Sequence, residues 1–462
     1  MNKYDLLIIG GGPAGITLTK NIKNKRDIGI MRPEDHSMIY CAMPYVIEDL
    51  LPYEKTLKTD SIVTDTGADL IRDLAVEIDF ENKIVKTAKD DDYGYNELII
   101  ATGADPILPP IAGVELDGVM TFKSENDLKE ILETVNSGIE NVSVVGAGAI
   151  GIELAQALNE KGINTNLIDM MPTVLPNMLD TEIAEGAEAE LRELGINLYL
   201  DKKVVELKGD STLKSIVLDD QEEIESELVV FAVGMKANVD FLKDSSLEIA
   251  VDGILVNEKM ETNVEDVYAA GDCVQFESGI TAEVISGKLA TNAVAMGRVL
   301  AANLLGRDRR YQGFYNGAAT KVGELYVGGT GLTEKMAAEK YELATAQAEF
   351  KTAFPIMPFA KDVKLKLIVN KADRKVLGGQ IISGEPVTDK VDKITMAVQY
   401  GLDVDQLLDF NYSSQPYQSF YPAHNLLVKA AEEAVKKKKA RKIKVKYLQF
   451  ESCFLSWSRI FL

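Results

Sequence analysis

The sequence contains few cysteines and histidines, and it lacks a long apolar run. Cys41, Cys273 and Cys453 are too few for a disulfide framework, which fits a chain that stays in the reducing cytoplasm. The only two histidines, His36 and His424, are not spaced as metal ligands, so no metal site is predicted. No segment is apolar enough to span a bilayer, and we expect no signal peptide before the first strand.

Basic residues are also in deficit, because 72 acidic and 50 basic side chains give a net charge of −22. That balance argues against a nucleic-acid partner. Residues 435–462 reverse it, with nine basic side chains, one acidic side chain and the only tryptophan. Such a tail could touch an anionic membrane surface, but a solvated extension is the favoured expectation. The length of 462 residues and an apolar share of 46% predict two or three globular domains.

Two glycine-rich turns form the most specific pattern in the chain. A strand pattern at 4–9 runs into Gly-Gly-Gly-Pro-Ala-Gly at 10–15, and another at 142–145 runs into Gly-Ala-Gly-Ala-Ile-Gly at 146–151. Both read G-x-G-x-x-G between a strand and a helix. The first glycine turns the chain, the second admits a pyrophosphate, and the third lets the helix pack on the strand. The pair predicts two dinucleotides, one held permanently and one visiting as a hydride donor.

Together with two later turns, these motifs resemble the FAD-dependent pyridine nucleotide-disulfide oxidoreductases over about residues 3–434. The resemblance assigns FAD to the first fingerprint and NADH to the second. The residues that it implies for FAD are Gly10, Gly12, Pro13, Ala14, Gly15, Ala101, Thr102, Gly103, Gly271 and Asp272, the last of which holds the ribityl chain. Those for NADH are Gly146, Gly148, Ile150, Gly151, Glu153, Asp169 and Gly234, although Glu153 reads equally well as a helical surface acid.

The same resemblance implies the fold and the division of the chain. It predicts an α/β protein with two Rossmann-like dinucleotide-binding domains, for FAD and NAD, and a C-terminal α+β dimerisation domain. The FAD-binding domain is expected at 1–113 and 249–327, and the NAD(H)-binding domain at 114–248. Residues 328–434 are expected to form the dimerisation domain, followed by the tail at 435–462.

The number of redox cysteines decides the subgroup. Cys41 lies in flanks that match the family's redox cysteine, but residues 42–46 hold no second one. The pattern is therefore similar to the single-cysteine group of NADH oxidases, NADH peroxidases, coenzyme A-disulfide reductases and persulfide or polysulfide reductases. A thiolate there accepts electrons from reduced flavin or attacks a disulfide, and a helix starting just after Cys41 would favour the ionised form. The oxidised form is then a sulfenic acid or a mixed disulfide.

Departures from the family pattern bear on the cofactor and the acceptor. Counting back from Cys41, Met31 stands where the family has an acid for the adenosine ribose of FAD, with Glu34 or Asp35 as substitutes. The first fingerprint also lacks the histidine of the peroxidases, which counts against peroxidase activity.

The evidence for coenzyme A as a substrate is mixed. Asn24 and Ala295 stand where coenzyme A-disulfide reductases present basic residues, although lysines at 20, 23 and 25 lie close in the sequence. Ser37 matches a residue that lines the coenzyme pocket in that group. A coenzyme A substrate is therefore weakened and not excluded.

The choice of hydride donor depends on Asp169, which is expected to end the second strand of the nicotinamide unit. A carboxylate there bonds both ribose hydroxyls and repels a 2′-phosphate. The following residues, 170–173, include no arginine or lysine, so NADH is predicted over NADPH.

Residues 415–425 resemble the family's C-terminal segment, which reaches over the flavin of the partner subunit. Tyr417 is expected at the partner's Cys41 as a proton donor, with Tyr421 as the rival; ordinary interface aromatics are an equal alternative.

These observations predict a homodimeric, cytoplasmic FAD-dependent NADH oxidoreductase that passes electrons through FAD and Cys41. The acceptor is O2, coenzyme A disulfide, a persulfide or a polysulfide. The alternative is a flavin-bearing redox sensor or binding protein with slow turnover.

Overall fold

The computed structural model describes residues 2–436, which form two compact units. The first unit comprises residues 2–170 and 195–314, and the second comprises residues 171–194 and 315–436. The domain boundaries inferred from the sequence are finer than this division and stay predictions. Nearly all of the basic tail lies outside the described residues.

The first unit contains a seven-stranded sheet in the order β5-β2-β1-β8-β7-β6, with β21 also paired to β8. β1 (Asn2–Ile9) runs parallel to β2 (Ile28–Met31) and β8 (Asp92–Ile100), and these strands are apolar because helices cover the sheet. The other strands are β5 (Asp69–Ile71), β6 (Ala75–Asp79), β7 (Ile84–Thr87) and β21 (Val267–Ala269).

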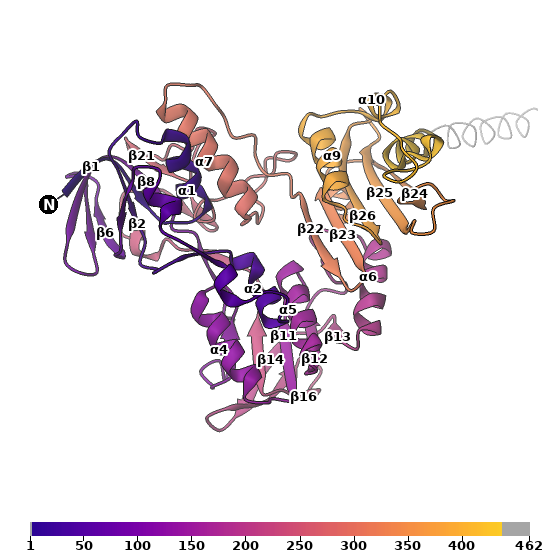
Figure 1. Cartoon of the computed structure of the whole chain (residues 1–462), viewed down its shortest axis with the longest axis horizontal. Helices are drawn as coiled ribbons and strands as arrows, with labels where there is room; N and C mark the ends of the chain where they lie inside the picture. Colours follow the sequence, from indigo (N-terminus) through magenta and orange to yellow (C-terminus); the bar gives the residue numbers. More distant parts are fainter. Residues whose placement is uncertain (1, 437–462) are drawn as a thin grey trace, which may run out of the picture. The chain divides into compact units, whose positions relative to one another are not determined.

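Two helices pack against each other beside this sheet, α1 (Pro13–Ile22) and α7 (Ala290–Leu304), as Figure 1 shows. Their close approach requires Gly297, because a Cβ there would lie 2.6 Å from the carbonyl oxygen of Ala14. The packing of α7 on α1 therefore holds α1, and the turn before it, against the sheet.

A second, fully parallel sheet in the same unit has the strand order β10-β17-β11-β12-β13. Its strands are β10 (Val119–Thr121), β11 (Asn141–Val145), β12 (Asn164–Asp169), β13 (Asn197–Leu200) and β17 (Leu228–Phe231). α5 (Ala149–Glu160) packs on β11 and β12, while α4 (Glu125–Asn136) starts at a capping box formed by Ser124 and Asp127. Both predicted βαβ units are thus confirmed.

Shorter elements complete the first unit. The chain crosses between them on the antiparallel pair of β9 (Ala104–Pro106) and β18 (Met235–Ala237). A three-stranded antiparallel sheet is formed by β14 (Val204–Gly209), β15 (Leu213–Leu218) and β16 (Glu223–Glu225). The remaining pieces are β3 (Ser37–Met38), η1 (Tyr40–Ala42), α2 (Met43–Ile47), η2 (Tyr53–Lys55), β4 (Leu57–Lys58), α3 (Ser61–Thr64), η3 (Asp240–Leu242), β19 (Ile249–Ala250) and β20 (Gly253–Ile254).

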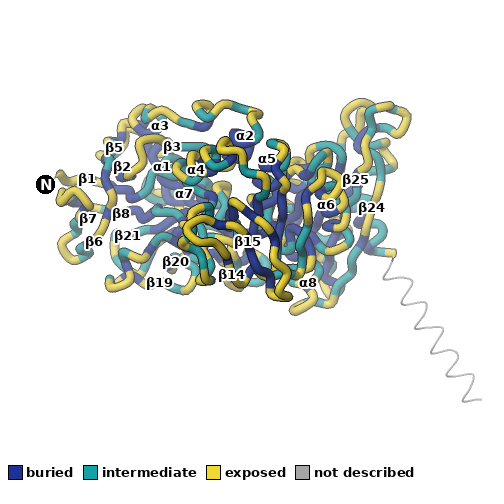
Figure 2. Tube along the Cα trace, turned by 90° about the horizontal axis from the view of Figure 1, so that it is seen from below, coloured by how far each residue is buried: buried dark blue, intermediate teal, exposed yellow. Residues whose placement is uncertain are grey.

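The second unit is an antiparallel five-stranded sheet in the order β22-β23-β26-β25-β24 with helices packed on it. The elements are β22 (Ala318–Val322), β23 (Leu325–Gly331), β24 (Leu343–Lys351), β25 (Asp362–Asn370), β26 (Val376–Ser383), α6 (Thr181–Glu193), α8 (Glu334–Ala338), α9 (Thr388–Gln399), α10 (Val404–Leu408) and η4 (Pro422–His424). The predicted α/β fold with a C-terminal α+β unit is confirmed, and the strands form the buried interior of each unit (Figure 2). Among residues 2–436, none of the helices combines the length and apolarity needed to cross a membrane.

The helix α6 joins the second unit although its residues follow β12 in the chain. Lys366, on β25, is only 1% exposed, and its ammonium group contacts the carboxylates of Asp180, Glu182 and Glu334 at 2.8, 2.5 and 2.6 Å. This cluster ties the start of α6 to the antiparallel sheet.

Candidate functional site

The first fingerprint joins β1 to α1 with the steric pattern of a dinucleotide cradle. A Cβ on Gly10 would lie 2.0 Å from the carbonyl oxygen of Ala101, and one on Gly15 would lie 2.5 Å from that of Gly10. A Cβ on Gly12 would meet nothing within 4 Å, so this glycine borders open space. α1 begins at Pro13 without a side-chain cap, which leaves its first turn able to bind an anion.

The second fingerprint repeats this geometry between β11 and α5. A Cβ on Gly146 would lie 2.5 Å from the carbonyl oxygen of Ala232, and one on Gly151 would lie 1.8 Å from that of Gly146. Gly148 borders open space, and no side chain caps α5. The side chain of Ile150, in the first turn of α5, is 47% exposed. Both predicted cradles therefore have the shape that a pyrophosphate needs.

Asp169 is the last residue of β12, as predicted, and its carboxylate lies on the second fingerprint. Its Oδ2 accepts a hydrogen bond from the backbone N–H of Ala147 at 2.6 Å. The next side chain, Met170, is 65% exposed and carries no charge. The strand end thus presents a carboxylate, without a nearby basic residue from the same turn, where a ribose is expected.

Asp272 supplies an unpaired acceptor in the interior of the first unit. Its Oδ1 is buried and has no hydrogen-bond partner in the part of the chain that the structure describes, while Oδ2 lies 3.8 Å from the ammonium of Lys123. Burial raises the pKa of Asp272, although Lys123 and Lys288 oppose the shift. A buried acceptor of this kind fits a hydroxyl donor such as the ribityl chain of FAD.

The turn at Ala101, Thr102 and Gly103 is fixed by hydrogen bonds on both sides. The N–H of Ala101 donates to the carbonyl of Ile9 at 2.8 Å, and the hydroxyl of Thr102 donates to the carbonyl of Asn238 at 2.7 Å. Gly103 has φ of +76°, and a Cβ there would meet nothing within 4 Å. The turn therefore borders the first cradle through Gly10 and leaves open space beside it.

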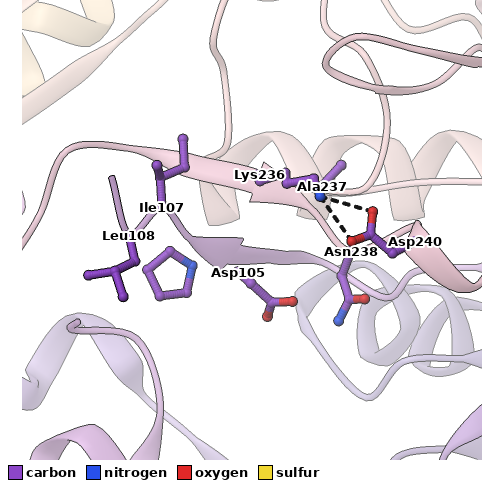
Figure 3. Close-up of a pocket in the computed structure, with 8 residues that line it drawn as sticks. Asp105, Ile107, Leu108, Lys236, Ala237, Asn238 and Asp240 are labelled. Atoms are coloured by element: carbon purple, nitrogen blue, oxygen red, sulfur yellow. Dashed lines mark hydrogen bonds and ion pairs between the residues drawn. The ribbon is translucent and has the colours of Figure 1, made fainter. Parts of the chain in front are cut away.

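A cavity of about 260 Å³ lies where β9 meets β18, close to this turn (Figure 3). It is lined by Asp105, Pro106, Ile107, Leu108, Lys236, Ala237, Asn238 and Asp240. An ion pair between Lys236 and Asp240 closes one side, and burial raises the pKa of Asp105. The nearby Gly234 accepts from the N–H of Ile107 at 3.0 Å. None of the predicted cofactor residues lines this cavity.

Cys41 lies on the turn η1, which leads directly into α2, and its side chain is exposed. The predicted helix start just after the cysteine is confirmed. α2 packs against α5, so the cysteine turn is held against the helix of the second cradle. Burial raises the pKa of Tyr45 on α2, and the negative charges of Glu153 and Cys41 add to the shift. Tyr45 therefore lies near both the cysteine and the acid that follows the second fingerprint.

Cys273 and Ser37 are both buried, but they have different surroundings. Cys273 is fully buried, and burial raises the pKa of its thiol to about 11, which agrees with a packing role. Ser37 is also buried, and it accepts a hydrogen bond from the guanidinium of Arg32. Ser37 is thus occupied by a neighbour, and its role at a coenzyme pocket stays a prediction.

Met31 does not hold the place that counting from Cys41 gave it. Its side chain is 1% exposed and lies in the core, so it cannot meet a ribose. The place that matches Asp169 belongs instead to Arg32, the residue just after β2, while Glu34 and Asp35 are exposed. Counting failed because it assumed a fixed loop length between this strand and the cysteine.

Tyr417 and Tyr421 lie on the second unit. The ring centroids of Tyr417 and Phe359 lie 4.6 Å apart, and those of Tyr421 and Phe354 lie 5.3 Å apart. Their side chains are 65% and 48% exposed, so both remain available to another molecule. Their placement at the partner's Cys41 stays a prediction.

Four residues near the cradles were not predicted from the sequence, namely Arg32, Tyr45, Asp60 and Lys123. Arg32 could have been found by aligning the two fingerprints on their strand ends. The others come from loops that no motif marks. Within residues 2–436, no group of three or more histidine, cysteine, aspartate or glutamate side chains could hold a metal ion.

Comparison with known proteins places this geometry in a family. Residues 4–297 match the sequence profile described as pyridine nucleotide-disulphide oxidoreductase, and residues 318–422 match the dimerisation domain of the same family. An NADH oxidase of Methanocaldococcus jannaschii is 32% identical over 450 residues, which cover 93% of this chain and 98% of that protein.

Two relatives act on sulfur compounds. An NAD(P)H coenzyme A polysulfide/persulfide reductase of Pyrococcus horikoshii is 31% identical over 410 residues, covering 86% of this chain and 92% of that protein. The solved structure of an NAD-dependent persulfide reductase from A. fulgidus superposes with a TM-score of 0.90 at 31% identity, covering 95% of this chain and 84% of that chain.

Proposed function

The chain belongs to the pyridine nucleotide-disulphide oxidoreductase family, and from this premise we propose that it reduces a small disulfide, persulfide or polysulfide with NADH. The observation that carries the proposal is the one exposed cysteine among residues 2–436, Cys41, on a turn packed against the helix of the second of two dinucleotide cradles. The members of this family depend on FAD and use NAD(P)H. FAD, held at the first cradle and Asp272, supplies the two-electron exchange between nicotinamide and sulfur.

Cys41 provides the nucleophile in this proposal. Its thiolate attacks one sulfur of the acceptor, so that a Cys41–sulfur bond forms, the acceptor's own sulfur–sulfur bond breaks, and one thiol leaves. Two electrons and protons then return Cys41 to the thiol and release the second half of the acceptor. The balance is one disulfide, one NADH and one proton converted to two thiols and NAD⁺. No second cysteine is needed, which fits the burial of Cys273.

O2 is the second candidate acceptor, favoured by the relative named NADH oxidase. In this version the electrons of one NADH reduce O2 to hydrogen peroxide, which oxidises the Cys41 thiol to a sulfenic acid and releases one water. The electrons of a second NADH reduce the sulfenic acid to the thiol and release the second water. The sum is one O2, two NADH and two protons converted to two water molecules and two NAD⁺.

An acceptor screen tests the proposal. Steady-state NADH consumption is measured under anaerobic conditions with coenzyme A disulfide, a glutathione disulfide control, polysulfide and a low-molecular-weight persulfide, and separately with O2 and peroxide detection. We expect sustained turnover with at least one sulfur acceptor at a kcat/KM above that for O2. Turnover with O2 alone would favour the second candidate. A single reduction without further NADH consumption would indicate the redox sensor instead.

Asp169 is proposed to select NADH over NADPH. Asp169→Ala should lower kcat/KM for NADH by about ten- to hundredfold, because hydrogen bonds from ribose hydroxyls to a charged acceptor are lost. Glu160→Ala, at an exposed acid that ends α5, is the matched control and should change neither cofactor. Equal kcat/KM values for NADH and NADPH in the unaltered protein would contradict the assignment.

The proposal includes a homodimer, since a dimerisation profile matches residues 318–422. In the dimer, Tyr417 would deliver a proton at the partner's Cys41, with Tyr421 as the alternative. The proposed location is the cytoplasm, where thiols are kept reduced. Sedimentation that gives only the mass of one chain at micromolar concentration would contradict the homodimer.

A further inference from the structure

The two cradles can be compared at the same point of their geometry, where the second strand of each unit ends. The N–H of Gly10 donates to the carbonyl of Met31 at 2.8 Å, and the N–H of Gly146 donates to the carbonyl of Ile168 at 2.7 Å. The residue that follows Ile168 is Asp169. By the same count, Arg32 holds in the first cradle the place that Asp169 holds in the second.

The side chains of Asp169 and Arg32 each lie against the second residue of the neighbouring fingerprint. Asp169 accepts from the N–H of Ala147, the second residue of its motif. The Cδ of Arg32 lies 2.5 Å from where a Cβ on Gly11, the second residue of the other motif, would stand. Gly11 is therefore needed to make room for the arginine, which covers this turn of the first cradle.

Arg32 is buried, and its hydrogen bonds are incomplete. Its side chain is 2% exposed, Nη1 donates to the hydroxyl of Ser37, and Nη2 donates to Oδ1 of Asp60 at 2.8 Å. Nε has no hydrogen-bond partner among the described residues. A buried N–H on a charged group without an acceptor is costly, so this atom indicates a missing acceptor.

Asp60 stands beside Arg32 as the nearest carboxylate. Its other oxygen accepts from Nη2 of Arg72 at 2.5 Å, and Nη1 of Arg72 donates to the carbonyl of Glu34 at 2.7 Å. The Asp60 side chain is 40% exposed, and each carboxylate oxygen can accept a further hydrogen bond. The carboxylate is thus held in place by two guanidinium groups while one side of it remains accessible.

We propose that Arg32 and Asp60 together bind the adenosine ribose of the FAD that occupies the first cradle, in place of a single acid at the strand end. The Nε–H of Arg32 donates to a ribose oxygen, and Asp60 accepts from a ribose hydroxyl. This inference rests on the proposed function, because it assumes FAD at the first fingerprint. It gives the orphaned nitrogen an acceptor and supplies the carboxylate that Met31 cannot.

The test compares two fragments of FAD on the apoprotein. ADP carries the adenosine half and FMN the flavin half, and the dissociation constants of FAD, ADP and FMN are measured by titration with fluorescence or calorimetric detection. Arg32→Met and Asp60→Asn should each weaken FAD and ADP by about ten- to hundredfold, the range for a hydrogen bond to a charged group, and leave FMN unchanged. Arg32→Lys, which lacks Nε–H, should behave like Arg32→Met.

Arg32→Glu distinguishes the proposed pair from a single acid most clearly, because it places an acid directly after β2. We expect weaker FAD and ADP binding from this variant, since the new carboxylate faces Asp60. Tighter binding would overturn the proposal, as would an unchanged ADP constant or an equal loss for FMN and ADP. Glu160→Ala, at the exposed acid that ends α5, is the matched control and should leave all three constants unchanged.

A folding defect, a failure of the proposed function and a failure of the role of Arg32 and Asp60 give different results. If Arg32→Met fails to fold, Asp60→Asn carries the same prediction at a more exposed site. An unaltered protein that binds no FAD would refute the proposed function. Normal FAD binding with no effect of either variant would refute only the role of Arg32 and Asp60.

Discussion

Replacing Cys41 with serine is expected to lower disulfide and persulfide reduction by about a thousandfold or more, while NADH still bleaches the flavin absorbance at its usual rate. The reason is that sulfur exchange needs a thiolate, and a serine hydroxyl is not ionised at neutral pH. Hydride transfer from NADH requires only that the nicotinamide lie against the flavin. Stopped-flow absorbance measures the first step, and thiol release measures the second.

Cys273→Ala is the matched control for this variant, because it removes the other described thiol. Cys273 is buried and its thiol pKa is raised, so its loss should leave sulfur reduction unchanged. With O2 as the acceptor, Cys41→Ser should divert the product from water to hydrogen peroxide, because the sulfenic acid step is lost. Unchanged disulfide reduction in Cys41→Ser would remove this cysteine from the mechanism.

Replacing Lys366 with methionine is expected to destabilise the second unit by about 3 kcal/mol at neutral pH, because it leaves the buried carboxylate of Asp180 without its cation. Asp180 is 9% exposed, whereas Glu182 and Glu334 are 40% and 45% exposed and recover hydration, so they contribute little. Urea unfolding, together with hydrogen exchange of the α6 amides, measures the change. Lys393→Met breaks an exposed pair with Asp389 and should cost less than about 1 kcal/mol.

The effect of Lys366→Met should also depend on pH in a defined direction. Burial is the largest single influence on the Glu182 carboxyl and raises its pKa, but the hydrogen bond and charge of Lys366, together with a backbone hydrogen bond and the charge of Lys364, lower the pKa overall. A lowered pKa in the folded state gives stability that is present above the unfolded value and is lost as pH falls through the folded one. The share of the difference that Glu182 contributes should therefore be present near neutrality and lost as pH falls through the lowered pKa of this carboxyl, so the difference shrinks slightly in acid. A difference that grows as pH falls would contradict the ion-pair account.

Local patterns predicted the two cradles well, because their chemistry is contained in short segments. The strand, turn and helix of each fingerprint are contiguous, and the glycines at 10, 15, 146 and 151 are required by backbone contacts that any such turn makes. Asp169 was also found, since it ends a strand at a fixed distance from its fingerprint.

Features that depend on distant segments could not be predicted in this way. Asp60 reaches Arg32 from 28 residues away, and the attachment of α6 depends on Lys366, which lies 184 residues from Glu182. Nothing in the periodicity of α6 distinguishes a helix on a parallel sheet from one on the antiparallel sheet. The wrong assignment of Met31 has a different origin, because counting back from Cys41 assumed that this chain keeps the family's spacing between the strand and the cysteine.

The central claim is that electrons from NADH reach both the flavin and Cys41. Anaerobic titration of the holoprotein with NADH tests it most directly, after treatment with excess disulfide and removal of the reagent. We predict that the unaltered protein takes up about two NADH per flavin, one for the mixed disulfide at Cys41 and one for FAD, whereas Cys41→Ser takes up about one. Equal uptake by the two proteins would contradict the account.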